Sequence, residues 1–224
     1  MNIGQDFKNY YTKHLGKGSL DLHYYENQIE SSMTPYILEE REMRVTQMDI
    51  FSRLMRDRLL WVAGPVDDRM STVVQAQLMF LDSSDKTDIT MHIDSPGGSV
   101  KSGLSMVDVM NYISCDIRTV NTGMAASMGS VLLGAGTKGK RSSLRFSRTM
   151  LHQSSGGFRG NIQDAEIDMK EWKKINETLF DLLGSYCGKT AKQVMKDASR
   201  DLWLSSQESL DYGIIDEIVK SKKG

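Results

Sequence analysis

Residues 117–136 read IRTVNTGMAASMGSVLLGAG and predict a strand, a tight turn and a helix in direct succession. Residues 117–123 have the β-branched content of a strand, and the small and apolar residues of 125–136 favour a closely packed helix. Ser127 lies where the two meet, in a pattern close to the G-x-S-x-G turn of nucleophilic serines, with Ala125 in place of the first glycine. By itself the motif is short, and a small-residue helix packed on a sheet explains it at least as well.

Strand-like and helical segments alternate at short spacing on both sides of this stretch. Strands are predicted at 59–64, 89–93, 117–123, 148–153 and 214–219, and helices at 47–58, 68–85, 102–113, 125–136, 161–183, 190–198 and 205–212. This alternation predicts an α/β domain with largely parallel strands and right-handed crossovers. Functional groups in such sheets gather at the carboxyl ends of strands, which here are the turns at 94–99, 123–128 and 152–157.

Composition excludes several classes of protein. Lysine and arginine number 28 against 29 aspartate and glutamate residues, a balance that argues against a general nucleic-acid binder. Cys115 and Cys187 are isolated and make no disulfide framework, and no phosphate-binding G-x-x-x-x-G-K-[ST] loop exists. Without a long apolar run or an apolar signal core, the sequence leads us to expect a cytoplasmic protein.

The first 33 residues differ from the rest of the chain. They are polar and lack sustained periodicity, so we expect an N-terminal arm or a propeptide over 1–33. Autocleavage near Ser31–Met33 is one hypothesis for such a segment. We expect one folded domain over residues 34–224.

A nucleophilic serine needs a neighbouring proton acceptor, and the chain holds four histidines. His14 and His23 lie in the N-terminal segment, and His92 lies inside a predicted strand. His152 ends a strand beside the flexible SSGG stretch, which suits a catalytic base better, although a surface histidine is an equal possibility. In the turn DSPGGS, the backbone N–H of Gly98 could stabilise an oxyanion or pair with an extended peptide.

An acid that orients the histidine would complete a triad. The residues alone do not choose among the aspartates that follow the histidine, which are Asp164, Asp168, Asp181, Asp197, Asp201, Asp211 and Asp216. Asp197 and Asp201 flank the end of a predicted helix, and Asp201 precedes an apolar LWL stretch that could bury it.

Four segments together resemble the Clp protease family of compartmentalised serine peptidases. They are DSPGGSV, GMAASMGSVLLGAGTKGKR, MLHQSSGG and RDLWLSSQESLDYGIIDEIV, within a similarity that runs from about Tyr36 to the C-terminus. The resemblance implies Ser127 as nucleophile, His152 as general base and Asp201 as the orienting acid. It also implies an oxyanion hole made by the N–H groups of Gly98 and Met128, and pairing of extended substrate with Gly98, Val100 and Ser155.

The resemblance further implies a crotonase-like α/β fold with a protruding helix-strand handle around 154–183. It implies two stacked seven-membered rings that enclose the active sites, and an AAA+ unfoldase that delivers unfolded proteins. The chain itself would need neither nucleotide nor metal.

Several positions depart from the family pattern. Ser154 replaces a proline after His-Gln, which predicts a less rigid substrate loop. Ser199 stands before Arg200 where an acidic residue is usual, which puts an inter-ring contact in doubt. Thr90 and His92 replace aromatic residues of the family's unfoldase-docking cleft, while Tyr112 matches an aromatic position there, so the partner could differ.

Two other functions remain open on the sequence. A crotonase-type acyl-CoA enzyme shares the fold and uses glycine N–H donors, but it would not need the serine, histidine and aspartate together. A non-catalytic ring subunit that scaffolds active copies would typically have lost triad members, and none is lost here.

Overall fold

The computed structural model describes residues 36–41, 44–154 and 161–220. They divide into two compact units, one ending at Arg56 and the other beginning at Asp57. The predicted arm at 1–33 and the predicted substrate residue Ser155 lie outside the described residues.

The first unit is a hairpin followed by a short helix. Strands β1 (Tyr36–Arg41) and β2 (Arg44–Asp49) pair antiparallel, and α3 (Ile50–Arg56) follows directly. Asp49 accepts the Ser52 N–H at 2.9 Å, and the hydroxyl and N–H of Ser52 lower the pKa of Asp49. The helix predicted over 47–58 is therefore too long at its start, because 47–49 belong to a strand paired with β1.

The second unit is built on a seven-stranded sheet. Its main path runs β3-β4-β5-β6-β9 with parallel pairing throughout, which confirms the predicted parallel sheet. Strand β7 pairs parallel with the end of β5, and β8 pairs antiparallel with β7. The strands are β3 (Leu59–Ala63), β4 (Ile89–Ser95), β5 (Ile117–Ala126), β6 (Arg141–Ser143), β7 (Arg148–Leu151), β8 (Leu202–Ser205) and β9 (Glu217–Ile218).

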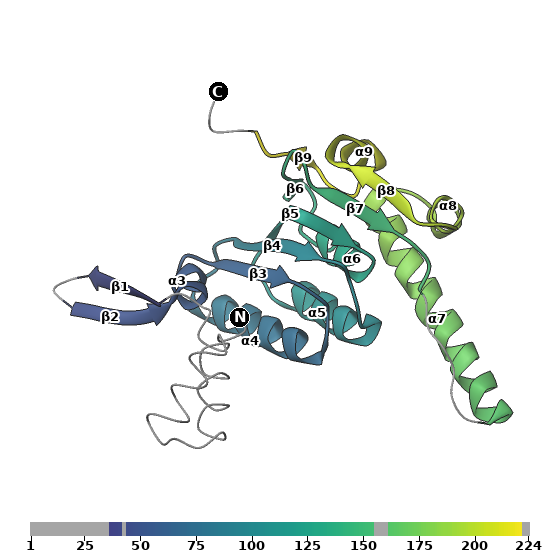
Figure 1. The fold of residues 1–224 in the computed structure, drawn as a ribbon, viewed down its shortest axis with the longest axis horizontal. Coiled ribbons are helices and arrows are strands. Elements are labelled where there is room, and N and C mark those ends of the chain that lie inside the picture. Colours follow the sequence, from purple (N-terminus) through teal and green to yellow (C-terminus); the bar gives the residue numbers. More distant parts are fainter. Residues whose placement is uncertain (1–35, 42–43, 155–160, 221–224) are drawn as a thin grey trace, which may run out of the picture. The chain divides into compact units, whose positions relative to one another are not determined.

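Helices join these strands and cover the sheet. They are α4 (Asp68–Ser84), α5 (Val100–Tyr112), α6 (Met128–Gly134), α7 (Ile162–Cys187), α8 (Ala191–Asp197) and α9 (Ser206–Tyr212). Figure 1 shows α4 and α5 side by side along one face of β3 and β4, and α7 extending well beyond the sheet. Ser205 and Glu208 form a capping box at the start of α9, and the Thr190 side chain caps α8.

The core lies between the central strands and the helices on that face. Strand β4 alternates buried and partly exposed residues up to its end, and its buried side meets apolar residues of α4 and α5. Fully buried side chains include Leu60, Val62, Leu78, Met91, Ile93, Met106, Leu132 and Phe180. This packing fixes the carboxyl ends of β4 and β5 relative to each other.

The starts of two more predicted elements differ from the structure. The helix predicted from Ala125 begins at Met128, because Ala125 and Ala126 extend β5 and pair with β7. The last strand is shorter than the predicted 214–219: Ile214 and Ile215 are buried in the core after α9, and only Glu217–Ile218 pair with β6.

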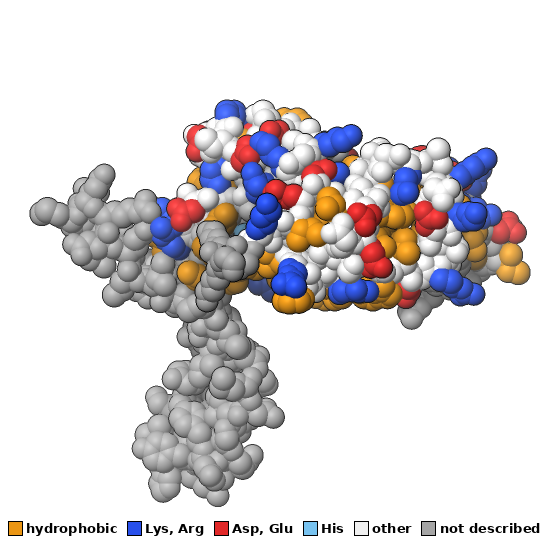
Figure 2. All heavy atoms as spheres, turned by 90° about the horizontal axis from the view of Figure 1, so that it is seen from above, with side chains coloured by type: hydrophobic (Ala, Val, Ile, Leu, Met, Phe, Trp, Pro, Cys, Tyr) orange, Lys and Arg blue, Asp and Glu red, His pale blue; other side chains and the backbone are white. Residues whose placement is uncertain are grey.

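Hydrophobic residues remain on parts of the surface. On the face shown in Figure 2 they form small patches among interspersed acidic and basic side chains. Along α7, Leu179 is buried, whereas Ile162 is 80% exposed and Ile167 is 67% exposed. Within the described part of the chain, no helix has the length and apolar character needed to cross a membrane.

Candidate active site

Ser127 lies in the turn between β5 and α6 in an unusual backbone conformation. Its φ of 54° is in a region that residues with side chains rarely occupy, so the surroundings must hold it there. The Ser127 N–H donates to the Met150 carbonyl on β7 at 2.9 Å. The Ser127 carbonyl accepts the N–H of Ser130 at 3.0 Å and its hydroxyl at 2.6 Å. The serine side chain makes no cap to its own helix, and its hydroxyl is therefore free for another partner.

The Pro-Gly-Gly turn after β4 brings the backbone of Gly97 close to Ser127. With φ at 89°, Gly97 passes against the serine turn, and a Cβ there would lie 2.6 Å from the Ser127 Cβ and 2.8 Å from the Met128 nitrogen. Only glycine allows so close an approach. The carbonyl of Gly97 accepts the Val66 N–H at 2.9 Å, and the Val66 carbonyl accepts the Ser99 N–H at 2.8 Å. The turn is therefore held from both sides.

Two backbone N–H groups beside this turn are unpartnered. Among the described residues, neither the Gly98 N–H nor the Met128 N–H has a hydrogen-bond partner. Met128 is the first residue of α6, where N–H groups have no partner inside the helix. Donors of this kind can stabilise an oxygen that becomes negatively charged during acyl transfer.

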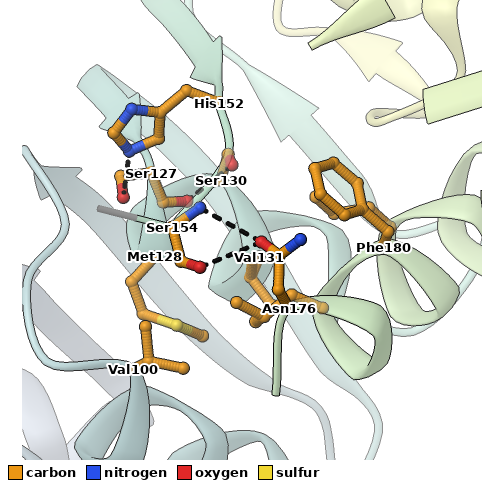
Figure 3. A pocket seen from close by; sticks show the side chains of 11 residues that line it. Val100, Ser127, Met128, Ser130, Val131, His152, Ser154, Asn176 and Phe180 are labelled. Carbon is orange, nitrogen blue, oxygen red and sulfur yellow. Dashed lines mark hydrogen bonds between the residues drawn. The ribbon is translucent and has the colours of Figure 1, made fainter. Parts of the chain in front are cut away.

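His152 faces Ser127 directly. The distance between His152 Nε2 and Ser127 Oγ is 2.8 Å, a hydrogen bond visible in Figure 3. Strand β7 brings the histidine there, because Met150 pairs with Ala126 at the end of β5. The His152 side chain is 25% exposed, so the contact is reachable from solvent.

Asp201 lies on the other side of the histidine ring. His152 Nδ1 and Asp201 Oδ1 are 3.5 Å apart, which is longer than a good hydrogen bond. The antiparallel register pairs Leu151 with Leu202, so the next residues outward, His152 and Asp201, stand opposite each other. The expectation that the LWL stretch buries Asp201 is wrong: its side chain is 61% exposed.

The other candidates for the acid and the base lie elsewhere. Asp197 accepts the hydroxyl of Tyr212 at 3.1 Å, and Asp216 pairs with Arg141. His92 stacks on Trp61 with ring centroids 4.6 Å apart, and burial lowers its pKa. None of these side chains lines the pocket around Ser127.

A largely apolar pocket adjoins the serine and histidine. The predicted substrate residue Val100 lines it, together with Met128, Val131, Leu179, Phe180 and Leu183. Ser154 and Asn176 add polar groups to its wall, and Figure 3 shows these two side chains facing each other. Reasoning from the sequence did not place any residue of α7 in the site, because helical spacing reveals a buried face but not what it meets.

Over 36–41, 44–154 and 161–220, no group of three or more histidine, cysteine, aspartate or glutamate side chains is arranged to hold a metal ion.

A serine hydroxyl bonded to a histidine, with a carboxylate beyond it and free N–H donors beside it, is the arrangement typical of serine hydrolases. Here it lies at the carboxyl ends of strands in a parallel sheet, which is where open α/β sheets bind their ligands.

Comparison with known proteins shows to which family of serine hydrolases the chain belongs. A model of the Clp protease family matches residues 40–222, and the chain belongs to that family. It is therefore a serine-type peptidase with the crotonase-like fold, and the acyl-CoA alternative is set aside.

Three relatives illustrate the match. "ATP-dependent Clp protease proteolytic subunit" of Porphyromonas gingivalis is 46% identical over 219 residues, covering 97% of this chain and 99% of the relative. The protein of the same name from Bacteroides fragilis is 46% identical over 218 residues, with 97% and 99% covered. That from Streptococcus pyogenes is 45% identical over 194 residues, with 85% and 99% covered. Because the first two alignments cover 97% of the chain, they include most of residues 1–33, which the sequence patterns had left without a counterpart.

Proposed function

We propose that Ser127 is the nucleophile of this peptidase, His152 its general base and Asp201 the acid that orients His152. The observation that carries this assignment is the 2.8 Å contact between Ser127 Oγ and His152 Nε2 on a turn that presents the serine hydroxyl. Asp201 supports it by facing the second ring nitrogen of His152.

The chemistry follows from these positions. Ser127 Oγ attacks the carbonyl carbon of the scissile peptide bond while His152 Nε2 takes the hydroxyl proton. The carbonyl oxygen becomes an oxyanion, which the N–H groups of Gly98 and Met128 stabilise. The tetrahedral intermediate collapses, the C–N bond breaks, and His152 returns the proton to the leaving amine. A water molecule, activated by the same histidine, then hydrolyses the acyl-enzyme ester and frees Ser127.

Substrate would bind as an extended chain beside this centre. We propose that it pairs with Gly98, with Val100, which lines the pocket beside Ser127, and with Ser155, which lies three residues after His152 in the sequence. Backbone pairing along such edges reads the peptide main chain, so it accepts many sequences. The apolar pocket next to Ser127 would take the side chain that precedes the cut bond.

The proposal extends to an assembly and a partner. The name of the relatives contains "ATP-dependent", yet this sequence has no phosphate-binding G-x-x-x-x-G-K-[ST] loop. ATP would therefore be used by a separate AAA+ unfoldase that supplies unfolded protein. The exposed apolar residues of α7, Ile162 and Ile167, would be covered in two stacked heptameric rings. Such a particle would act in the cytoplasm and need no metal or nucleotide of its own.

Labelling with a fluorophosphonate probe tests the nucleophile. The assembled wild-type protein is expected to label, and Ser127→Ala is expected to abolish labelling, because the probe reacts only with an activated serine. His152→Ala should slow labelling by at least about 100-fold, since general-base assistance contributes about that much. Ser185→Ala, which removes an exposed serine of α7, is the matched control and should label like wild type. Labelling that survives Ser127→Ala would refute the assignment.

A further inference from the structure

Ser154, two residues after His152, is bound to α7 by three hydrogen bonds. The indole Nε1 of Trp172 lies 2.6 Å from Ser154 Oγ, and that oxygen lies 2.9 Å from Asn176 Oδ1. The Ser154 backbone N–H also donates to Asn176 Oδ1, at 3.3 Å. Figure 3 shows the two dashed contacts between Ser154 and Asn176 beside the serine and histidine.

The direction of these bonds is determined by chemistry. An indole N–H can only donate, so Ser154 Oγ accepts from Trp172. The hydroxyl proton of Ser154 is then directed to Asn176 Oδ1, which also receives the backbone N–H. Trp172 therefore donates to Ser154 and Ser154 donates to Asn176, so the three side chains form one connected network.

This network restrains the chain just after β7, where the described backbone makes no hydrogen bond to the sheet. Strand β7 ends at Leu151, and within the described residues no backbone group of His152, Gln153 or Ser154 bonds to another backbone group. Buried or half-buried backbone needs such restraint to keep one conformation. The contacts to α7 supply it at Ser154, which lines the pocket beside Ser127. The sequence predicted a less rigid loop because Ser154 stands in place of proline; side-chain hydrogen bonds supply a restraint of another kind.

We propose that Ser154, Trp172 and Asn176 are positioning residues that hold the polar wall of the pocket beside Ser127, which Ser154 and Asn176 line. They act on the binding of a peptide and not on the reactivity of Ser127, because none of the three hydrogen bonds that link them involves Ser127 or the His152 ring. This inference rests on the proposed triad and deepens it by naming what aligns the adjoining substrate wall.

The test separates peptide binding from serine reactivity in the assembled protein. Ser154→Ala, Trp172→Phe and Asn176→Leu each break the network and are expected to raise KM for a fluorogenic peptide about 5- to 10-fold, a loss typical of one or two hydrogen bonds. The rate of fluorophosphonate labelling of Ser127, which needs no extended substrate, should stay within about twofold of wild type. Ser154→Thr keeps the hydroxyl and should behave like wild type. Trp61→Phe, which changes a tryptophan outside the pocket, is the matched control for Trp172→Phe.

A double-mutant cycle makes the test sharper. Ser154→Ala removes the hydroxyl that links Trp172 to Asn176, so it serves as the background for the second substitution. In that background Trp172→Phe should have no further effect, whereas in the Ser154 protein it raises KM. An unchanged KM in Ser154→Ala, or a loss of labelling equal to the loss of peptide hydrolysis, would overturn the positioning role. Failure of wild-type labelling would instead overturn the proposed triad.

Discussion

Two acid–base pairs in the sheet differ in the distance between their atoms, in burial and in the number of their partners. Arg141 on β6 pairs with Asp216 just before β9, with Nη2 and Oδ1 2.6 Å apart and side chains 4% and 19% exposed. His152 and Asp201 continue β7 and β8, with nitrogen and oxygen 3.5 Å apart and side chains 25% and 61% exposed. The first pair is closed to solvent and the second is open to it.

The first pair is bound by many groups. Asp216 accepts from the Arg141 side chain and from the N–H groups of Arg141 and Gly139, while the guanidinium also donates to the carbonyls of Tyr186 and Gly213. Burial by itself would raise the pKa of Asp216, but the hydrogen bonds from Arg141 outweigh it and lower that pKa.

The buried pair contributes to the stability of the fold, whereas the exposed pair belongs to the proposed catalytic site. The Arg141–Asp216 pair ties β6 to the C-terminal segment, and its proton content does not change near neutral pH. The His152–Asp201 pair has few partners, so the histidine can gain and lose a proton during each turnover without disturbing the core.

Breaking the closed pair should have the largest effect. Asp216→Ala leaves the Arg141 guanidinium buried without its carboxylate, and we expect the free energy of unfolding to fall by about 3 kcal/mol. Denaturant unfolding measures this. Arg118→Met, which removes a partner from the exposed pair with Glu217, is the matched control and should unfold close to wild type. Equal stability of Asp216→Ala and wild type would show that the closed pair is not structural.

Breaking the open pair should affect activity and leave stability alone. Asp201→Asn is expected to lower kcat for peptide hydrolysis about 10- to 100-fold, less than the roughly 10⁴-fold seen for a buried triad aspartate, because solvent can replace much of an exposed contact at 3.5 Å. Its melting temperature should match wild type. Asp197→Asn, at the end of the same helix-strand connection, is the control and should retain full kcat. A kcat unchanged in Asp201→Asn would remove that residue from the site.

Acid pH should separate the two pairs in the same sample. Peptide hydrolysis is expected to fall as pH decreases, because His152 must be neutral to accept the serine proton. The stabilisation from Asp216 is fully present above the ordinary aspartate pKa of about 3.9, and it is lost only as pH falls through the lower folded-state value. Activity should therefore be lost at a higher pH than the fold. Activity and circular dichroism measured together check this, and an activity that falls only when the protein unfolds would contradict the base role.

The local features of the site could be predicted from the sequence. The Pro-Gly-Gly turn and the small residues around Ser127 allow a close backbone approach, and Gly97 makes that approach in the structure. The alternation of strands and helices predicted a parallel α/β sheet, which the pairing of β3, β4 and β5 confirms. Exact helix starts were harder, because Ala125 and Ala126 suit a helix by composition but pair with β7 as a strand.

What only the tertiary structure decided is how distant segments meet. The seven possible acids after His152 have no local mark that distinguishes them, and the β7–β8 register places Asp201 opposite the histidine. The contacts of Trp172 and Asn176 with Ser154 likewise depend on where α7 crosses the end of the sheet. The glycines and small residues that permit the nucleophile turn are local features of the sequence, but the positive φ of Ser127 is held by a hydrogen bond to Met150 on β7. Contacts across the fold depend on strand register and helix packing, which form only when the whole domain is assembled.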